Sequence, residues 1–560
     1  MADINTSQTA LGKLTVYPAR KIITMTDAQP TAQAVAVADG KIVSVGTMAS
    51  LEPWLARYAH DIDDRFADKV LMPGLIDAHV HPSLPAVLTQ FPFIAPDDWI
   101  LPTGKFPGVK TPDAYRARLQ ELVAAHTDAN APFVTWGYHP LWHGKLTRAE
   151  LTTLFPNTPV ILWHRSFHEV YCNDAALAFL KISEADVAGN PEINWQEGHF
   201  WENGFQVAIL KLSALVFQPA RYSAGMQNFL KMVHMAGVTT CLDMGTGMFG
   251  DPVGETALIR KIAEETQAPC RIILTPIILQ LLMNGATPEQ ALAECEEWHK
   301  GNSHRVFFDR HFKIMMDGAI FSGLSQMDFP GYLDAHNGVW LAPPETTLKW
   351  AQVFWNAGYQ IHAHTNGDLS ADMLIDMVRQ MQAVKPRFDH RTVLEHFAYS
   401  TEEQTRQMRA LGMLVSANAY YHYILSDIYS SEWFGTDRGA QMVRLGSLER
   451  AGMPFALHSD CPMAPLSPLT WAWAAATRKT INGNVSGAEE RISLHTALRA
   501  ITIDAAWIVR RENEIGSIRA GKRADFAVLD QDPYEVGAEG LKDIPIWGTV
   551  FEGVPYPIAP

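Results

Sequence analysis

The amino-acid sequence predicts an α/β fold: a (β/α)8 TIM-type barrel with a β-sandwich formed by both chain termini and a long insertion after the first barrel strand. Three observations predict this fold. Apolar runs alternate with helical patterns through the middle of the chain, as they do in proteins with parallel sheets. Both ends of the chain carry short β-type runs joined by glycine turns. One interval between two predicted strands is much longer than a barrel connection requires.

The two chain ends are predicted to be β structure. Residues 34–38 and 41–45 flank Asp39-Gly40, which is a two-residue hairpin signal. Short β-type runs of the same kind occupy residues 516–518, 521–530 and 549–553 near the other end. We therefore expect residues 1–70 and 506–560 to form the two parts of one sandwich, attached to a barrel of residues 71–505.

Eight apolar runs are predicted to be the barrel strands. They are continuously apolar, as strands buried on both faces should be, and helical patterns such as residues 345–357 and 402–410 lie between most of them. About 155 residues separate the first two strands, so residues from about 85 to 225 form an insertion. This insertion is rich in aromatic residues, and we expect it to cover the mouth of the barrel. The predicted strands are residues 71–80, 238–244, 271–276, 312–316, 360–364, 392–396, 413–417 and 454–458.

The composition excludes several functional classes. With 47% hydrophobic and 19% charged residues, the 560-residue chain has the composition of a soluble globular enzyme. Its formal charge of −15 argues against nucleic acid or an anionic membrane as the main partner. The five cysteines are scattered without a CxxC pair, which indicates reduced thiols. Because residues 1–21 lack the apolar core of a signal peptide and no stretch is long enough to span a bilayer, we expect a cytoplasmic protein.

The segment Leu75-Ile76-Asp77-Ala78-His79-Val80-His81-Pro82 is the most informative part of the sequence. On a β-strand, side chains two residues apart point to the same face, so His79 and His81 can reach one metal ion together. Pro82 ends the strand just beyond them. Two histidines hydrogen-bonded in a cleft would give the same pattern, so the rest of the chain must supply the missing ligands.

Further ionisable residues lie at or near the carboxyl ends of the predicted barrel strands, where the active sites of such barrels are built. Histidine and carboxylate side chains are the usual ligands of Zn²⁺ and related divalent ions in hydrolytic sites. Their convergence at one end of the barrel therefore predicts a metal centre. The residues that converge there are His79, His81, Lys313, His364, His396 and Asp460.

Several motifs follow one another in order along nearly the whole chain. They are Pro73-Gly74-Leu75-Ile76-Asp77-Ala78-His79-Val80-His81, Phe312-Lys313-Ile314-Met315-Met316-Asp317-Gly318, His364-Thr365-Asn366-Gly367-Asp368, Leu394-Glu395-His396 and His458-Ser459-Asp460-Cys461-Pro462. Inside the insertion, Phe167-His168-Glu169-Val170-Tyr171-Cys172-Asn173 matches a lid segment. With these motifs the chain resembles the amidohydrolase superfamily, and within it the amidohydrolase family 3 branch that includes N-substituted formamide deformylases. The resemblance implies a metal-dependent hydrolase.

The resemblance also implies how the candidate ligands are shared between metal ions, with one or two ions of Zn²⁺ or a related divalent metal. Lys313, carboxylated by CO₂, would bridge two ions, because a free ammonium group cannot bind a cation. The alternative is a lysine paired with Asp317 or another acid, which leaves the number of ions open. The implied ligands are His79, His81 and Asp460 for one ion, and His364 and His396 for the other.

Several other residues have two interpretations. His168, in the insertion, is either a hydrogen-bond donor to the substrate or a packing residue. Tyr420 and Tyr421 either line an aromatic substrate pocket or belong to a packed loop. His362, two residues before His364, is an alternative ligand. His458, two residues before Asp460, is interpreted as structural.

These residues together predict metal-dependent hydrolysis. A divalent ion would activate water and polarise a carbonyl group, and Asp460 would take the proton from the water and deliver it to the leaving amine. The expected bond is a C–N bond of an amide, N-formyl or N-acyl amine in a small, apolar or aromatic substrate. Hydrolysis of an ester, lactone or carbamate and a catalytically inactive relative are alternatives, as is ring-amine deamination, although Gly367 stands where deaminases of the superfamily carry a glutamate. By the same resemblance the chain is expected to form a homodimer.

Overall fold

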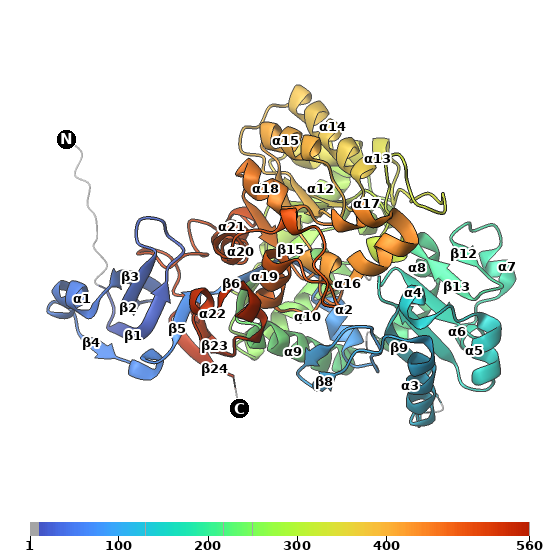
Figure 1. Ribbon diagram of the computed structural model, residues 1–560, viewed down its shortest axis with the longest axis horizontal. Helices are drawn as coiled ribbons and strands as arrows, with labels where there is room; N and C mark the ends of the chain where they lie inside the picture. The colour runs from blue at the N-terminus through green and yellow to red at the C-terminus, as the bar shows by residue number, and fades with distance from the viewer. Residues whose placement is uncertain (1–10, 129, 217, 249, 559–560) are drawn as a thin grey trace.

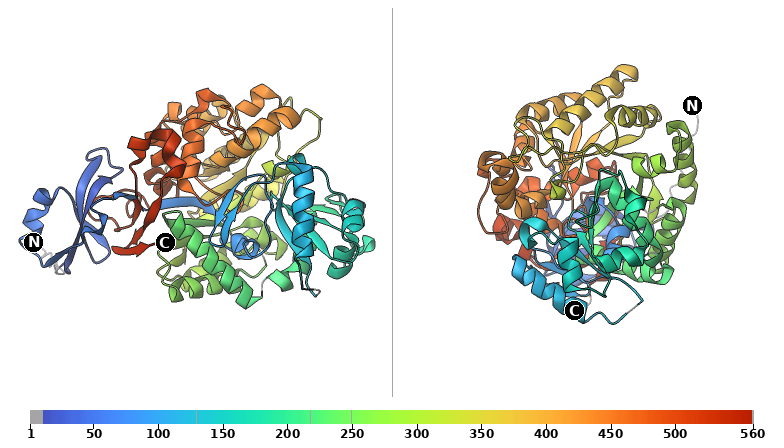
Figure 2. Two further views of the ribbon diagram at one scale, coloured as in Figure 1. Left: turned by 60° about the horizontal axis from the view of Figure 1, so that its bottom comes forward. Right: turned by 90° about the vertical axis from the view of Figure 1, so that its right-hand side faces the viewer.

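The computed structural model describes residues 11–128, 130–216, 218–248 and 250–558. Figure 1 shows an elongated molecule with three parts in a row. A sheet with strands from near both ends of the chain lies on the left, parallel strands with their helices lie in the middle, and the helices α3 to α8 with their strands lie on the right. The left view of Figure 2 shows the same order. In the described residues, no helix combines the length and the apolar character needed to cross a membrane.

Both chain ends contribute to one eight-stranded sheet. Its order is β24-β23-β22-β5-β1-β2-β3, with β4 paired to β1. As predicted, Asp39-Gly40 joins β2 to β3, and both residues have positive φ (50° and 74°). The shared sheet agrees with the prediction that the two ends fold together, while the second layer of a sandwich stays a prediction. The strands are β1 Leu14–Ile23, β2 Thr31–Ala38, β3 Lys41–Gly46, β4 His60–Ile62, β5 Val70–Pro73, β22 Phe526–Leu529, β23 Ile546–Phe551 and β24 Val554–Pro557.

The middle of the chain contains two sheets in which all strands are parallel. One has the order β16-β15-β14-β6 and the other β17-β18-β19-β20-β21. In the described residues their ladders are not one continuous sheet, but a β-bridge between Ile277 and Lys313 joins them on one side. On the other side the Asp460 N–H donates to the His79 carbonyl oxygen (2.9 Å). The strands are β6 Leu75–Val80, β14 Val238–Thr246, β15 Arg271–Pro276, β16 Val306–Phe308, β17 His311–Met315, β18 Gln360–Thr365, β19 Val393–His396, β20 Leu414–Ala417 and β21 Phe455–Leu457.

Two of these strands correct the sequence prediction. Residues 71–80, predicted as one strand, form β5 of the terminal sheet and β6 of the parallel sheet, with Gly74 between them. The Gly74 N–H donates to the Asp525 carbonyl oxygen (2.9 Å), and a Cβ at this position would lie 2.1 Å from Thr239 Oγ1. Because glycine has no Cβ, Gly74 allows the backbone to pass close to Thr239 where the chain leaves the terminal sheet and enters the parallel sheet. The strand β16 was not among the predicted strands.

Helices connect most of the parallel strands, as the alternating pattern predicts. Many begin with a proline in the first turn or with a threonine cap; Thr401, for example, forms a capping box with Gln404 at the start of α15. The main connecting helices are α10 Pro252–Glu265, α11 Ile278–Met283, α12 Pro288–Trp298, α13 Pro344–Asn356, α14 Asp368–Val384, α15 Glu402–Leu411, α16 Ala419–Tyr429 and α18 Leu445–Ala451. After the last parallel strand come α19 Pro468–Thr477, α20 Leu494–Arg499, α21 Ile503–Ile508 and α22 Pro533–Gly540.

The insertion after β6 has its own sheet, with the order β12-β13-β11-β10-β9, and a separate hairpin β7-β8. This five-stranded sheet lies at the end of the molecule opposite the terminal sheet, whereas α9 of the insertion packs against β14 and β23 (Figure 2). The strands of the insertion are β7 Trp99–Leu101, β8 Gly104–Phe106, β9 Phe133–Tyr138, β10 Val160–His164, β11 Glu169–Cys172, β12 Ile193–Asn194 and β13 His199–Trp201. Its helices are α2 Ser83–Leu88, α3 Pro112–Ala124, α4 Pro140–His143, α5 Arg148–Leu154, α6 Asp174–Leu180, α7 Glu184–Val187, α8 Glu202–Val216 and α9 Pro219–Met235.

Candidate metal centre

The first group of possible metal ligands comes from the first and last parallel strands. The Nε2 atoms of His79 and His81 lie 3.3 and 3.0 Å from Asp460 Oδ1. His79 is fully buried, and its Nε2 has no partner with hydrogen-bond geometry among the described residues. Two imidazoles and a carboxylate that converge on one point are a donor set that suits a divalent metal ion.

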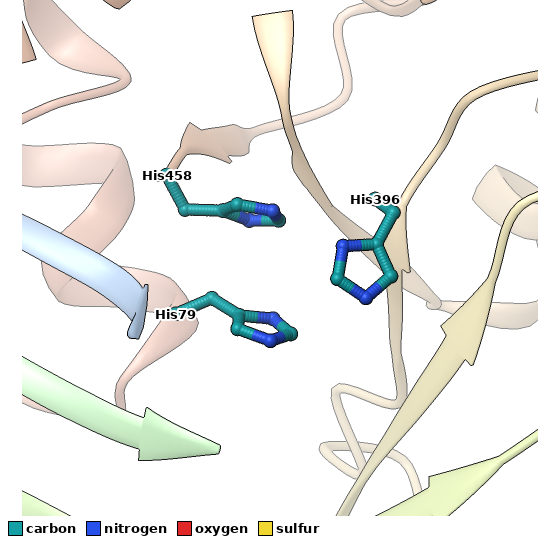
Figure 3. Close-up of side chains that lie close together, drawn as sticks. All are labelled: His79, His396 and His458. Carbon is teal, nitrogen blue, oxygen red and sulfur yellow. The ribbon is translucent and has the colours of Figure 1, made fainter. Parts of the chain in front are cut away.

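A second group shares His79 and adds His396 and His458. Figure 3 shows the three imidazole rings around a common space, with the rings of His79 and His458 side by side and His396 facing them. All three are buried, and the Nε2 atom of each has no described hydrogen-bond partner. The sequence prediction interpreted His458 as structural. The structure brings it to the centre, with its Nδ1 2.7 Å from Ser416 Oγ.

The backbone at this centre is unusual at two of the candidate ligands. His396 and Asp460 have φ values of 76° and 55°, a region that residues with a side chain rarely occupy. Such conformations persist where the surroundings hold them, and they are frequent at functional sites. Tyr421 closes the same corner, since its hydroxyl donates to Asp460 Oδ2 over 3.5 Å and lies 3.4 Å from His396 Nδ1.

Lys313 is buried in the same region. Its side chain is 1% exposed and its Nζ has no described hydrogen-bond partner. Burial lowers the pKa of Lys313 to about 8, against the opposing effect of Glu395 and Asp460. The structure does not pair it with Asp317, whose carboxylate accepts the backbone N–H groups of Asn366, Gly367 and Gln326. A buried amine without a hydrogen-bond partner is compatible with a lysine that reacts with CO₂ or binds a metal ion.

His364 lies next to this centre but belongs to neither group. Its ring centroid is 4.4 Å from that of His396, and its Nε2 is 2.9 Å from the side-chain amide nitrogen of Asn366. His362, the alternative ligand from the sequence, uses both ring nitrogens elsewhere. Its Nδ1 lies 2.7 Å from Glu395 Oε1 and its Nε2 lies 3.0 Å from His311 Nδ1.

Glu395 is a residue of the site that sequence reasoning missed. Its carboxylate is fully buried and contacts His79 Nδ1 through Oε2 (2.8 Å) as well as His362 Nδ1 through Oε1. Burial raises the pKa of Glu395 to about 7, while Lys313 and His458 act to lower it. The signal in the sequence was an acidic residue inside an otherwise apolar strand, directly before the strand-end histidine.

The candidate ligands line a pocket together with residues of the insertion and of the loops and helix that follow β14, β15 and β17. The ligand residues in its lining are His79, His81, Lys313, His364 and Asp460. Much of the remaining lining is apolar, and it includes Leu84, Trp163, Phe167, Phe205 and Ile209 of the insertion and Met248 after β14. A small apolar or aromatic group can therefore lie directly above the candidate ligands.

Of the three residues predicted to contact a substrate, two line the pocket and one does not. His168 lines the pocket, and its Nδ1 lies 2.7 Å from the buried Glu202 carboxylate. Burial lowers the pKa of His168, but the charge and hydrogen bond of Glu202 outweigh it and raise the pKa above its usual value. Tyr421 also lines the pocket. Tyr420 is not among the lining residues, since its hydroxyl donates to Asp97 over 2.8 Å.

Comparison with known protein families decides the relationship of this chain. The model of the amidohydrolase family matches residues 67–556, which is most of the sequence. The chain belongs to the amidohydrolase family. This confirms the resemblance that the motifs predict. The match includes every candidate ligand and the whole insertion, so the centre and the pocket both lie within the part that the family shares.

Two curated relatives of this amidohydrolase align with it over most of their lengths. The N-substituted formamide deformylase of Arthrobacter pascens is 26% identical over 557 residues, which cover 93% of this chain and 94% of the relative. The Arabidopsis thaliana protein LONG AFTER FAR-RED 3 is 23% identical, with 93% of this chain and 88% of the relative covered.

Solved structures support the fold. An uncharacterized metal-dependent hydrolase from Pyrococcus horikoshii has a TM-score of 0.71 at 18% identity, over 94% of this amidohydrolase and 99% of that chain. An adenosine deaminase from Xanthomonas campestris with bound zinc has a TM-score of 0.54 at 13% identity, over 97% and 93%. At these identities the likeness concerns the fold, and it supports a barrel-like arrangement of the two parallel sheets.

Proposed function

We propose that this amidohydrolase uses a bound divalent metal to hydrolyse a C–N bond. The metal proposed is Zn²⁺, and the substrate is a small apolar or aromatic amide, N-formyl or N-acyl amine. The observation that carries the proposal is the convergence of His79, His81 and Asp460 in a pocket that is lined largely by apolar side chains. The similarity to a formamide deformylase supports the type of bond.

The donor atoms that the structure brings together fit such an ion. His79, His81 and Asp460 would hold one ion. His396, with His364 beside it, would take part in a second position, bridged by Lys313 in its carboxylated form. The unpartnered buried nitrogens of His79, His396 and Lys313 support this assignment, because a buried polar atom without a partner is costly. A bound ion supplies Lewis acidity, which activates water and polarises a carbonyl group.

The protein's own groups would move the proton and position the substrate. Asp460 lies between the strand-end histidines and Tyr421, where its carboxylate can accept a proton from the attacking water and donate it to the leaving nitrogen. His168 has a free Nε2 among the described residues, and this atom is available to donate a hydrogen bond to a substrate in the pocket. The apolar wall excludes water around the substrate.

The test combines metal analysis with a substrate panel. We expect purified protein to contain about one or two equivalents of a divalent metal per chain, and to hydrolyse N-substituted formamides or N-acyl amines with apolar or aromatic substituents. Esters, lactones, carbamates and ring amines of similar size complete the panel. Protein that binds no metal, or metal-loaded protein that acts on another class and leaves every amide and formamide intact, would contradict the proposal.

A further inference from the structure

Glu395 lies behind His79, on the side away from the substrate. It is fully buried and is not among the residues that line the pocket, so it does not reach a substrate there. Each of its carboxylate oxygens lies within hydrogen-bond distance of the Nδ1 atom of a different histidine, and the Nδ1 of a third, His458, lies farther away, 3.7 Å from Oε2. Oε2 lies 2.8 Å from the Nδ1 of His79, and Oε1 lies 2.7 Å from the Nδ1 of His362.

This arrangement decides where the protons of these imidazoles are. When Glu395 is ionised it can only accept hydrogen bonds, so in this form the Nδ1 atoms of His79 and His362 both carry a proton and donate it to Glu395. A neutral imidazole has one N–H, which leaves a lone pair on the Nε2 of each ring. The Nε2 of His362 uses its lone pair to accept from the Nδ1–H of His311, over 3.0 Å. One carboxylate therefore determines the tautomers of three histidines.

The lone pair on His79 Nε2 is the one that matters for the metal centre. This atom lies 3.3 Å from Asp460 Oδ1 and belongs to both groups of candidate ligands. A proton on Nε2 would block it as a ligand. In known metal sites, a carboxylate behind a histidine ligand fixes the tautomer and ring orientation and raises the basicity of the ligand.

We propose that Glu395 is a positioning residue that holds His79 in the tautomer able to bind a metal ion. The proposal rests on the proposed metal site and adds a residue to it. Glu395 acts through His79, without touching metal or substrate. Its second oxygen is needed because His362 competes for the same carboxylate.

The substitution Glu395→Gln tests this, because the amide has one acceptor oxygen where the carboxylate has two. Only one of the two histidines can then donate to it, and the other must accept from the amide N–H and carry its proton on Nε2. We expect zinc affinity, measured by competition with a chelator, to fall about 10- to 100-fold. The visible spectrum of the cobalt-substituted protein should change as well, because His79 is a poorer ligand.

A matched control is Glu490→Gln. Glu490 is also a buried carboxylate, but it bonds Ser447 and Arg450 away from the centre. We expect this variant to lose stability while its zinc affinity and cobalt spectrum stay as in the wild type. An equal loss of affinity in both variants would show that removing any buried carboxylate has this effect, and would overturn the proposal.

A second variant separates tautomer control from loss of charge or of folding. In the double variant E395Q/H362L, His79 no longer shares the amide oxygen, so it can donate to it again. We expect its zinc affinity to recover most of what E395Q loses, even if E395Q alone folds poorly. No recovery in the folded double variant, or wild-type affinity in E395Q, would overturn the role of Glu395. Wild-type protein that takes up no zinc would instead overturn the proposed metal site itself.

Discussion

The backbone N–H of Asp460 donates a hydrogen bond to the carbonyl oxygen of His79, over 2.9 Å. These residues stand at opposite ends of the parallel part of the chain, and the bond places two candidate ligands of one ion next to each other. The His81 N–H makes a similar bond to the Cys461 carbonyl oxygen (3.3 Å). Backbone pairing therefore brings the residues of the first group of ligands next to one another.

Removing the Asp77 carboxylate should loosen this junction. Asp77 is fully buried, and its side chain accepts hydrogen bonds from the Ser459 N–H (3.1 Å), the Ser459 hydroxyl and the His79 N–H (3.3 Å). Asp77→Ala leaves these donors unpaired, and we expect a loss of about 1–3 kcal/mol in the free energy of unfolding of metal-free protein in urea. Asp77→Asn keeps an acceptor and should lose less. Equal stability of all three proteins would contradict this.

Asp460→Asn should separate folding from activity. The amide can accept the Tyr421 hydrogen bond, and the backbone bond to His79 is unaffected. We therefore expect a melting temperature close to that of the wild type. Because an amide cannot accept a proton from water, turnover should fall at least about 100-fold. Steady-state kinetics on a substrate from the panel measure this, and wild-type kcat would remove Asp460 from its proposed role.

Phe205→Leu should change substrate preference without affecting the metal. Phe205 in α8 lines the pocket, with its ring centroid 5.5 Å from that of Trp163. An aromatic contact adds about 0.5–1.5 kcal/mol, so kcat/KM for a substrate with an aromatic substituent should fall roughly 2- to 10-fold. A linear alkyl substrate of similar size should be less affected, and metal content unchanged. Phe179→Leu, at an exposed position, is the control; an equal loss for both substrates would contradict the contact.

The insertion should lose stability in acid because of His143. Its Nδ1 accepts the His139 N–H (3.0 Å), its Nε2 donates to the Val109 carbonyl oxygen (2.8 Å), and burial lowers its pKa to about 3. The unfolded chain binds this proton near pH 6.5, so stability is lost as the pH falls from about 6.5 towards 3, by about 1.4 kcal/mol per unit.

The comparison with His143→Gln isolates this effect, since glutamine keeps one donor and one acceptor but does not titrate. Between pH 7 and pH 4.5, the difference in unfolding free energy between wild type and variant should shift by about 2–3 kcal/mol against the wild type. Urea denaturation at the two pH values measures the shift. Parallel stability curves would show that His143 does not cause the acid sensitivity.

The sequence predicted the parallel strands and most candidate ligands because these features are local. The spacing of His79 and His81 indicates that they share one face of a strand, and the apolar runs indicate where the strands lie. Glu395 was missed because its partners His79 and His362 lie in other strands, and nothing in its own segment names them. His458 was interpreted as structural because the lack of a hydrogen-bond partner for its Nε2 can be seen only in the folded structure.

The break at Gly74 was missed for a related reason. The run of residues 71–80 is mostly apolar, and the residues on both sides of the break are buried. What separates β5 from β6 is the close approach of Thr239, a residue far along the chain. A pattern of hydrophobicity records burial, but it does not record which sheet a strand joins.

The lining of the pocket has parts of separate origin, and this has an evolutionary consequence. The candidate ligands lie at the ends of the parallel strands, whereas other lining residues, such as Trp163 and Phe205, belong to a section with its own sheet. Substitutions in that section can change the shape of the space above the centre without altering the strands below it. Duplicated copies of such a chain can therefore diverge towards new substrates while they inherit the same chemistry, so sequence change should accumulate faster in the insertion than around the ligands.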